Sequence, residues 1–466
     1  MRLCALTASF VLAAQAGAKK DELTVKTTSG TYTGLVNSTA PDVNQWLGIP
    51  YGLPPLGSRR FMPPSRAPNY GAADAKAYKP ICFQDNGSKT GVYWELPAKK
   101  KLPVIIWVCG GGFKEGGGHA LYQVPDQWIQ RTQTHLVVTF NYRLNIFGFP
   151  GSSAASKNAG LMDIRLAVEW PKTTLTDSGK GDPRRMVLYG QSAGAVAALT
   201  YGYAYPQQPI VGGIIASSSG TSATYPTNSS NFHNVAQVAG CANLTATEEL
   251  ACMQNIDALE LQQKVVAANP DPTRGLFRPL ADNITVFANM TDRLEKGLVA
   301  KLPVIAGFTY NEPAAFLLFD PDATAAPNAT TPGADGLACG VKREAARRIA
   351  YGLTTYRYLY SGNFTNITPR YWLGGMHSSD IPLVFGTHHQ YRGNSTELEW
   401  QTSFAMQSFW VSFAANPSAD PRNHVGQVWP KFTGTDGDII VFGNATVPSA
   451  SYAAPVAIAD KYSGAC

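Results

Sequence analysis

The sequence predicts an α/β fold in which one large, mostly parallel, mixed sheet is covered by helices on both faces. Short apolar runs rich in β-branched residues alternate with longer helical patterns along the chain. Those runs are continuously apolar, which is typical of parallel strands buried on both faces. A chain of 466 residues, 44% hydrophobic and only 15% charged, also has enough apolar material for a large core.

Four runs in the first half are expected to form strands of this sheet: 102–108, 136–140, 186–189 and 214–216. Helices are expected at 161–170, 192–203, 257–267, 341–350 and 399–415. Pro171 should end the first of these helices, because proline lacks an N–H and clashes with the preceding turn. Residues 321–335, rich in Ala, Pro, Thr and Gly, predict a surface loop. No repeat or clear linker divides the chain, so residues 19–466 are expected to form one large domain.

Residues 1–18 have the composition of a secretory leader. Arg2 supplies the positive start, residues 3–14 form an apolar run too short to span a bilayer, and small residues at 14–16 and 16–18 offer cleavage sites. No later stretch has the pattern of a transmembrane helix. We therefore expect an extracellular protein with no membrane span.

Glycosylation motifs and cysteines favour the same compartment. The chain has eleven N-x-[ST] sequons. Loss of the leader leaves six cysteines, an even number that permits disulfides in an oxidising environment: Cys82, Cys109, Cys241, Cys252, Cys339 and Cys466. Their spacing does not match a zinc site, and we expect no metal. The net charge of +6 is small, and the basic run 99–101 is typical of a solvated loop, so no nucleic-acid partner is expected.

Residues 190–194 read Gly-Gln-Ser-Ala-Gly and fit the pattern of a nucleophile elbow around Ser192. A hydroxyl is a weak nucleophile unless a base reaches it, and a sharp turn between a strand and a helix exposes the serine oxygen to such a base. The turn crowds backbone atoms together, which calls for small residues two places before and after the serine. An apolar strand pattern leads in and a small-residue helical pattern leads out. Ser192 is therefore the candidate nucleophile.

A glycine run, 110–112, directly follows the expected strand 102–108. Glycines let backbone N–H groups approach a substrate closely, and such donors stabilise the negative charge that develops on a carbonyl oxygen during acyl transfer. A dinucleotide site is excluded there, because the G-x-G-x-x-G spacing is absent.

In these motifs the chain resembles the type-B carboxylesterase, cholinesterase and lipase family of α/β-hydrolases, and within it the secreted fungal carboxylesterases. The resemblance runs from about residue 23 to the C-terminus. It is carried by the elbow and by these further segments: Leu47-Gly48-Ile49-Pro50-Tyr51, Arg60-Phe61, Gly110 to Phe113, Asn141-Tyr142-Arg143, Phe147-Gly148-Phe149, Asp163-Ile164-Arg165 and Gly181-Asp182-Pro183.

The resemblance implies an active site. It places an oxyanion hole on the N–H groups of Gly111, Gly112 and Ala193. Glu312 matches the family's acid in the segment 307–312, and His377 matches its histidine in His377-Ser378-Ser379-Asp380-Ile381-Pro382. The order Ser, Glu, His along the chain agrees with the α/β-hydrolase order.

Chemistry alone does not choose among the seven histidines. A base must be an imidazole held in one tautomer by an acid, which any of them could satisfy. The adjacent pair His388 and His389 could suggest a metal, but neighbouring residues of a strand point to opposite faces. His377 is preferred through its surrounding motif, and for Glu312 the alternative is an ordinary surface carboxylate.

The resemblance also implies supporting pairs. It pairs Cys241 with Cys252 and Cys339 with Cys466, although free or exchanged thiols remain open. Arg143 and Asp163 match a structural ion pair, and Ser219 matches a serine just behind the catalytic residues.

The chain departs from the family pattern at several places. The segment of the type S-E-D-C-L that usually follows the first cysteine is missing, so Cys82 loses its usual partner and Arg60 its usual glutamate. An unpaired buried cation is costly, and one strand is expected to be absent or rebuilt. A Cys82–Cys109 bridge is one alternative. The run from Glu312 to Cys339 is also short for the family.

The expected function is hydrolysis of soluble carboxylic esters with short or medium acyl chains, without a cofactor. A lipase is the nearest alternative, disfavoured because the loop that forms the lid in related lipases has lost its second cysteine. An inactive, cholinesterase-like binding protein is the alternative from another class, and retention of Ser192, Glu312 and His377 disfavours it.

Overall fold

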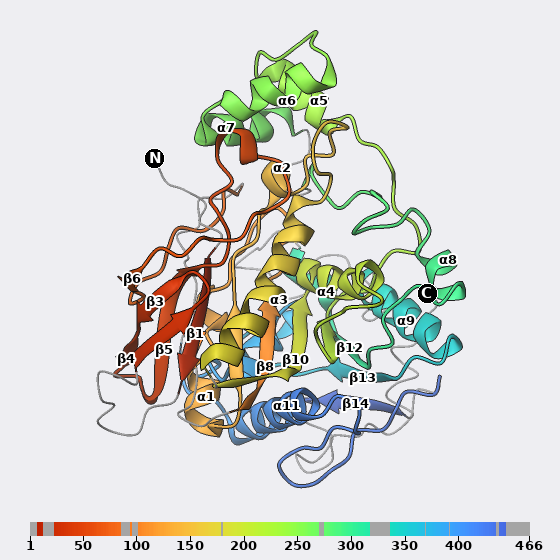
Figure 1. Cartoon of the computed structure of the whole chain (residues 1–466). Coiled ribbons are helices and arrows are strands. Elements are labelled where there is room, and N and C mark those ends of the chain that lie inside the picture. The colour runs from red at the N-terminus through yellow and green to blue at the C-terminus, as the bar shows by residue number, and fades with distance from the viewer. Residues whose placement is uncertain are drawn as a thin grey trace.

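The computed structural model describes residues 7–12, 23–84, 94–95, 101–178, 180–269, 275–316, 336–368, 370–390, 392–434 and 438–443. Within these ranges, one sheet of eleven strands runs through the body of the molecule in the order β14-β13-β12-β11-β10-β8-β9-β7-β1-β5-β4 (Figure 1). The seven strands from β14 to β9 are mutually parallel, and the remaining four are antiparallel to their neighbours. This is the mixed α/β architecture that the sequence predicts.

The parallel strands are the apolar runs of the sequence. Their bounds are β8 Leu102–Val108, β9 Leu136–Thr139, β10 Gly181–Gln191, β11 Gly213–Ser217, β12 Val304–Thr309, β13 Thr355–Tyr360 and β14 Ile439–Phe442. Every residue of β8, β9, β11, β12 and β13 is buried, as expected for strands covered on both faces.

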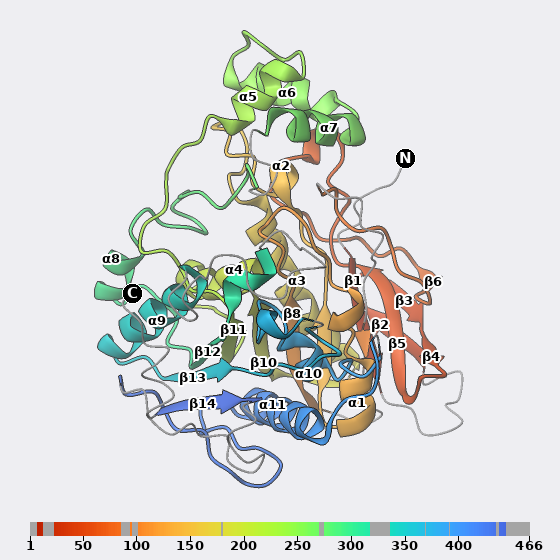
Figure 2. The same cartoon turned by 180° about the vertical axis from the view of Figure 1, so that it is seen from behind.

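Helices cover both faces of this sheet. The helices α3, Ala159–Ser178, and α4, Ala193–Ala204, lie in front of it in Figure 1. Seen from behind, α1, Asp126–Thr132, α10, Ile381–Phe385, and α11, Glu397–Ala415, are in front (Figure 2). The 15-residue helix α9, Gly336–Ala350, packs on β12 and β13. Shorter elements are α2 Asn145–Gly148, α8 Met290–Glu295 and the 3-10 turns Gly57–Arg59, Leu121–Gln123, Glu312–Phe316 and Tyr371–Leu373.

The expected end of α3 at Pro171 is wrong. Pro171 lies inside the helix, which continues to Ser178. A proline inside a helix removes one backbone hydrogen bond and strains the preceding turn. The next turn offsets this cost, because Thr174 and Leu175 are almost completely buried there. The predicted loop 321–335 lies outside the described residues.

The antiparallel strands form one end of the large sheet. They include β4, Leu35–Asn37, β5, Ala40–Pro50, and the two-residue strand β7, Trp94–Glu95. Between β5 and β7 lies β1, Thr7–Leu12, which pairs with β5 in antiparallel register. In the full-length chain, an interior strand is therefore formed by a segment that the sequence predicts to be removed with the leader. A second, three-stranded sheet contains β2 Thr24–Thr27, β3 Gly30–Thr33 and β6 Ala72–Asp74.

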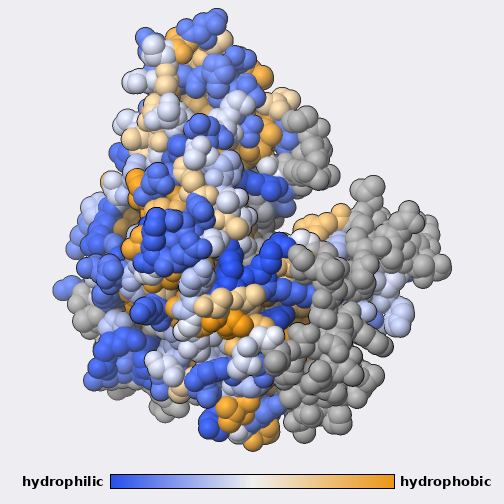
Figure 3. Space-filling model, turned by 90° about the vertical axis from the view of Figure 1, so that its right-hand side faces the viewer, coloured by the Kyte–Doolittle hydropathy of each residue, from blue (hydrophilic) through white to orange (hydrophobic). Residues whose placement is uncertain are grey.

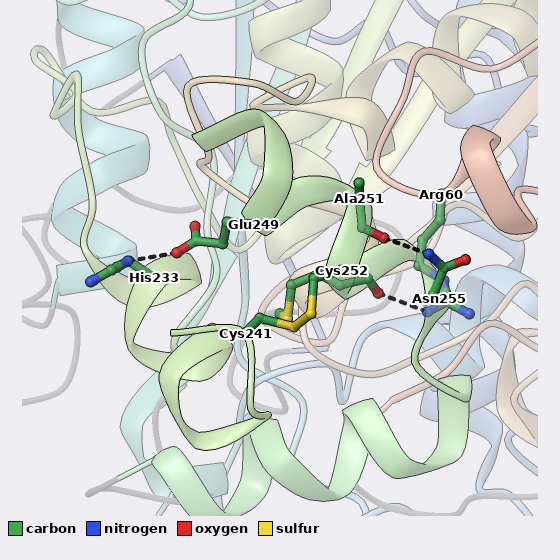
Figure 4. The surroundings of a disulfide bond; sticks show 8 residues. Arg60, His233, Cys241, Glu249, Ala251, Cys252 and Asn255 are labelled. Atoms are coloured by element: carbon green, nitrogen blue, oxygen red, sulfur yellow. Dashed lines mark hydrogen bonds and ion pairs between the residues drawn. A yellow bond between two sulfur atoms is a disulfide. The ribbon is translucent and has the colours of Figure 1, made fainter. Parts of the chain in front are cut away.

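A small helical lobe stands above the body of the molecule (Figure 1). It consists of α5 Asn231–Val238, α6 Ala246–Asn255 and α7 Ala258–Ala268. Cys241, just before α6, is joined by a disulfide to Cys252 within it, as Figure 4 shows. Thr245 and Glu248 form a capping box at the start of α6, and Asp257 caps α7.

Arg60 connects this lobe to the body, and the expectation that it is an unpaired buried cation is wrong. Its guanidinium donates hydrogen bonds to the carbonyl oxygens of Met253, at 3.1 Å, and Ile256, at 2.5 Å. These carbonyls belong to the end of α6, where the last carbonyl groups have no partner inside the helix and the dipole attracts a cation. Backbone oxygens thus replace the missing glutamate.

Candidate active site

The predicted catalytic residues lie at one edge of the parallel sheet. Ser192 follows β10, Glu312 follows β12, and the segment of His377 follows β13. Because parallel strands end at the same edge, residues far apart in sequence meet there. Ser192 and His377 line one cavity of about 1900 Å³, together with the glycines 110–112 and Ser219.

Ser192 lies on a strained turn between β10 and α4. Its backbone has φ 56° and ψ −124°, a region that costs free energy for a residue with a side chain. Its N–H donates to the carbonyl of Ser217 at 2.8 Å, which ties the turn to the end of β11. A β-carbon on Gly190 would lie 2.1 Å from the carbonyl oxygen of Gly194, and one on Gly194 would lie 2.1 Å from that of Val108. The two glycines of the motif are therefore required by the turn itself.

Three backbone N–H groups beside Ser192 are free to bind a substrate oxygen. Gly111 has φ 110° and Gly112 φ 61°, conformations that favour glycine. Ala193 opens α4, where the first N–H groups have no partner within the helix. Within the described residues, the N–H groups of Gly111, Gly112 and Ala193 donate no hydrogen bond. All three residues line the cavity.

Glu312 and His377 meet directly. A carboxylate oxygen, Oε2, of Glu312 contacts Nδ1 of His377, and both side chains are buried. The other carboxylate oxygen accepts the Thr309 N–H at 2.7 Å. A short backbone bridge joins the two loops, since the Asn311 N–H donates to the Gly375 carbonyl at 2.8 Å. Glu312 is thus no surface carboxylate: its position fixes the ring orientation of His377.

The far nitrogen of His377 faces a residue that the sequence did not single out. Nε2 of His377 lies 3.1 Å from the side-chain amide nitrogen of Gln191, which also donates to Oγ of Ser378 at 2.8 Å. Within the described residues, no hydrogen bond joins the Ser192 hydroxyl to His377. A hydrogen bond from the Ser192 hydroxyl to Nε2 would therefore have to replace the contact with the Gln191 amide. Catalytic hydrogen bonds are often incomplete before substrate binds.

A buried polar chain supports the site from behind. The hydroxyl of Tyr358, on β13, lies within hydrogen-bond distance of a carboxylate oxygen of Asp380, at 2.9 Å, and of Oγ of Ser217, at 2.7 Å. Burial, reinforced by the nearby charge of Glu312, raises the pKa of Asp380 to about 7. The Tyr358 ring packs directly on Gly307, where a β-carbon would lie only 2.0 Å from it. Asp380 stands in the histidine motif, whereas no sequence signal distinguishes Tyr358.

The remaining predicted pairs are placed as follows. Arg143 and Asp163 form a fully buried ion pair with an Nη2–Oδ1 distance of 2.7 Å. Ser219 lines the cavity and donates to the Gly220 carbonyl at 3.4 Å. Cys339 is disulfide-bonded, and its partner sulfur lies outside the described residues.

Cys82 is also disulfide-bonded, although the segment that carries its usual partner in the family is missing. The alternative of a Cys82–Cys109 bridge is excluded because Cys109 is a free, buried thiol. Burial raises the pKa of the Cys109 thiol to about 12, which keeps it protonated and unreactive.

The residues described by the structure contain no group of three or more side chains suited to hold a metal ion. His388 is bonded through Nδ1 to Oγ of Ser395 at 2.6 Å and lies 3.3 Å from Glu399. It follows α10 in a turn and is not part of a strand. Across the same described ranges, none of the helices combines the length and apolar character needed to cross a membrane.

Comparisons with known proteins agree with this architecture. The model of the carboxylesterase family matches residues 21–333 and 336–455. Chlorogenic acid esterase of Aspergillus niger is 38% identical over 463 aligned residues, which cover 90% of each chain. Secreted lipase 5 of Gibberella zeae is 35% identical over 85% of this chain and 86% of its own. Acetylcholinesterase of Bungarus fasciatus is 26% identical over 96% of this chain and 87% of its own. The chain belongs to the carboxylesterase family and is a carboxylic ester hydrolase.

Proposed function

We propose that this hydrolase works through an acyl-enzyme on Ser192, with His377 as general base and Glu312 as the acid that orients it. The observation that carries the proposal is the contact between Glu312 and Nδ1 of His377 beside the strained turn that presents Ser192 to the same cavity. A buried carboxylate on Nδ1 holds the imidazole in the tautomer whose Nε2 accepts a proton.

In the first step, the Ser192 oxygen attacks the ester carbonyl carbon while its proton passes to Nε2 of His377. The carbonyl oxygen becomes negative and is held by the N–H groups of Gly111, Gly112 and Ala193. His377 then gives its proton to the leaving alcohol, and an acyl-enzyme remains. Water attacks this ester with His377 again as base, which releases the acid and restores Ser192. Each oxyanion donor contributes about 3–4 kcal/mol of barrier reduction in related chemistry.

We propose soluble esters as the substrates, with chlorogenic acid as the first to test. The relative named for chlorogenic acid is more similar to this chain than the relative named as a lipase. The disulfide at Cys82 does not restore the closure of the loop that forms the lid in related lipases, because residues 83–108 contain no cysteine and Cys109 is a free thiol. A lipase therefore stays as the second candidate. Kinetics distinguish it from an esterase for soluble substrates, because the activity of a lipase would rise sharply above the solubility limit of a long-chain ester.

The central experiment is covalent labelling with a fluorophosphonate. We expect one label on Ser192, complete loss of label and of p-nitrophenyl ester hydrolysis in Ser192→Ala, and a fall of roughly 10⁶-fold in kcat for His377→Ala. A p-nitrophenyl ester series from two to sixteen acyl carbons then gives the chain-length preference. A folded wild-type protein that takes no label would instead be an inactive binding protein.

Secretion is the remaining part of the proposal, and it rests on the composition of residues 1–18 and on a relative named as secreted. We expect the mature protein in the medium to begin near residue 17 or 19, which N-terminal sequencing and intact mass measure. A mature chain that still begins before Thr7 would show that β1 is retained in the sheet.

A further inference from the structure

The wall of the catalytic cavity carries an excess of positive charge that ester hydrolysis itself does not require. Among the described lining residues, four are lysine or arginine, namely Lys114, Arg278, Arg343 and Arg347, and one is acidic, Glu115. Two of the cations have acidic neighbours: Lys114 lies 3.9 Å from Glu115, and Arg347 pairs with Glu344. Arg278 and Arg343 are the cations whose charge remains to be explained.

Arg343 is presented to the cavity by one face of α9. Gly336, Gly340, Arg343 and Arg347 all line the cavity, and their spacing of three or four residues places them along the same side of the helix. Gly340 packs against the backbone of Gly220, close to Ser219, because a β-carbon on Gly220 would lie 2.2 Å from the Gly340 carbonyl oxygen. This close packing sets α9 against the loop that follows β11, beside the active site.

Arg347 anchors this face. Its guanidinium donates to the carbonyl and hydroxyl oxygens of Thr221, at 2.8 and 2.9 Å, and to Glu344 at 2.6 Å. Glu344 is fully buried and also accepts the Thr221 hydroxyl at 2.5 Å. Arg347 is therefore held by the protein, and its charge is balanced locally. One turn earlier, Arg343 is left to face the cavity.

Arg343 and Arg278 are exposed, and neither forms an ion pair or hydrogen bond within the part of the chain that the structure describes. They reach the cavity from different segments, Arg343 from α9 and Arg278 from the loop 275–280, where Gly275 packs on the side chain of Lys114. The side of the molecule that carries α8 and α9 has strongly hydrophilic residues gathered at mid-height (Figure 3). A guanidinium binds carboxylate with paired, parallel hydrogen bonds.

We propose that Arg278 and Arg343 recognise a carboxylate on the substrate, so that the preferred esters carry a negative charge away from the ester bond. This inference rests on the proposed function, because it specifies which esters the Ser192 site selects. Cationic walls raise the local concentration of anionic substrates and hold them while the ester reaches the serine. Neutral esters remain substrates without this advantage.

The test uses substrate pairs that differ in one charge. Chlorogenic acid is compared with its methyl ester, and p-nitrophenyl hydrogen glutarate with p-nitrophenyl pentanoate, which places the charge first on the alcohol part and then on the acyl part. We expect a lower KM for the charged member of at least one pair. In Arg278→Gln/Arg343→Gln, that KM should rise by roughly tenfold with kcat little changed, while the neutral member keeps its kinetics. Arg343→Lys should recover part of the effect, and added salt should weaken it.

Arg59→Gln serves as the matched control, since Arg59 is exposed and lies outside the cavity lining. Equal KM values within both pairs for the wild-type enzyme, or equal shifts for charged and neutral members in the double variant, would overturn the inference. Failure of the proposed function is recognised separately: Ser192 would take no fluorophosphonate, and p-nitrophenyl pentanoate would not be hydrolysed.

Discussion

At the scale of single residues, Gln191 is the feature that most directly affects the chemistry. Its amide nitrogen points at Nε2 of His377, which is compatible only with an unprotonated Nε2. Because Glu312 contacts Nδ1 and Gln191 donates to Nε2, the two contacts together leave Nε2 as the nitrogen that can accept a proton. Gln191 occupies the nitrogen that the proposed mechanism assigns to Ser192, so we propose that Gln191 positions the His377 ring.

Replacing this amide by a carboxylate tests that role. In Gln191→Glu, the new charge would stabilise the imidazolium form of His377, so the acid limb of the kcat/KM profile should move up by about one pH unit. Ser378→Ala, which removes the other hydrogen-bond partner of the amide, is the control and should leave the limb in place. An unchanged profile in Gln191→Glu would show that the amide does not act on His377.

The sequence predicted those residues whose geometry is local. The spacing of Gly190, Ser192 and Gly194 follows from one turn, and the turn is the same in the structure. Glu312 and His377 could be chosen only through family motifs. The contacts of Gln191 with His377 and of Tyr358 with Ser217 join residues 186 and 141 positions apart. No periodicity carries such information, because it depends on how whole strands are ordered in the sheet.

At the scale of elements, Arg60 shows how the fold compensates for a missing partner. Its guanidinium replaces a carboxylate with two backbone carbonyls at the end of α6 and lies 5.9 Å from the centre of the Phe147 ring. Sequence analysis identified the lost glutamate but could not identify these carbonyls, since α6 lies nearly 200 residues further along the chain. The same limit applies to Pro171, where burial of the next turn outweighed a local rule.

Arg60 should therefore control the stability of the helical lobe. In Arg60→Met, the side chain keeps its length but frees two carbonyls in a partly buried position, which costs about 1–3 kcal/mol. We expect faster limited proteolysis within 231–268 and a lower midpoint of urea unfolding. Arg59→Met, next in sequence and exposed, is the control. Equal cleavage rates in the two variants would mean that the lobe is held by its apolar contacts and disulfide alone.

At the scale of the whole molecule, buried titratable groups make the free energy of unfolding depend on pH, both as the pH rises toward 7 and as it drops toward 3. On the neutral side the relevant group is Asp380, whose pKa burial raises to about 7. The folded protein then keeps a proton that the unfolded chain has released, so the contribution of Asp380 is fully present below about pH 4 and is lost as pH rises toward 7. In Asp380→Asn this loss should disappear.

The measurement for Asp380 is the free energy of unfolding at pH 4, 5, 6 and 7. We expect the difference between Asp380→Asn and wild type to shift in favour of the variant as pH rises across this range. Asp420→Asn, which removes a partly exposed carboxylate on the surface, is the control and should give a nearly constant difference. A constant difference for Asp380→Asn as well would place the titration of Asp380 outside this window.

On the acid side, the contribution of His135 to stability changes with pH in the opposite direction. It is fully buried against Trp128, with ring centroids 4.4 Å apart, and burial lowers its pKa to about 3, assisted by the charge of Arg131. The unfolded chain takes up a proton near pH 6.5 that the folded protein does not bind, so stability falls as pH drops from about 6.5 toward 3.

His135→Phe keeps the aromatic contact and abolishes the proton uptake. Thr132, which bonds to the His135 ring, also bonds to the Trp128 carbonyl and keeps a partner. The variant should therefore unfold at lower pH than wild type in a circular-dichroism acid titration, with little difference at pH 8. If both proteins unfold at the same pH, other groups govern acid denaturation, and the neutral burial of His135 contributes nothing to it.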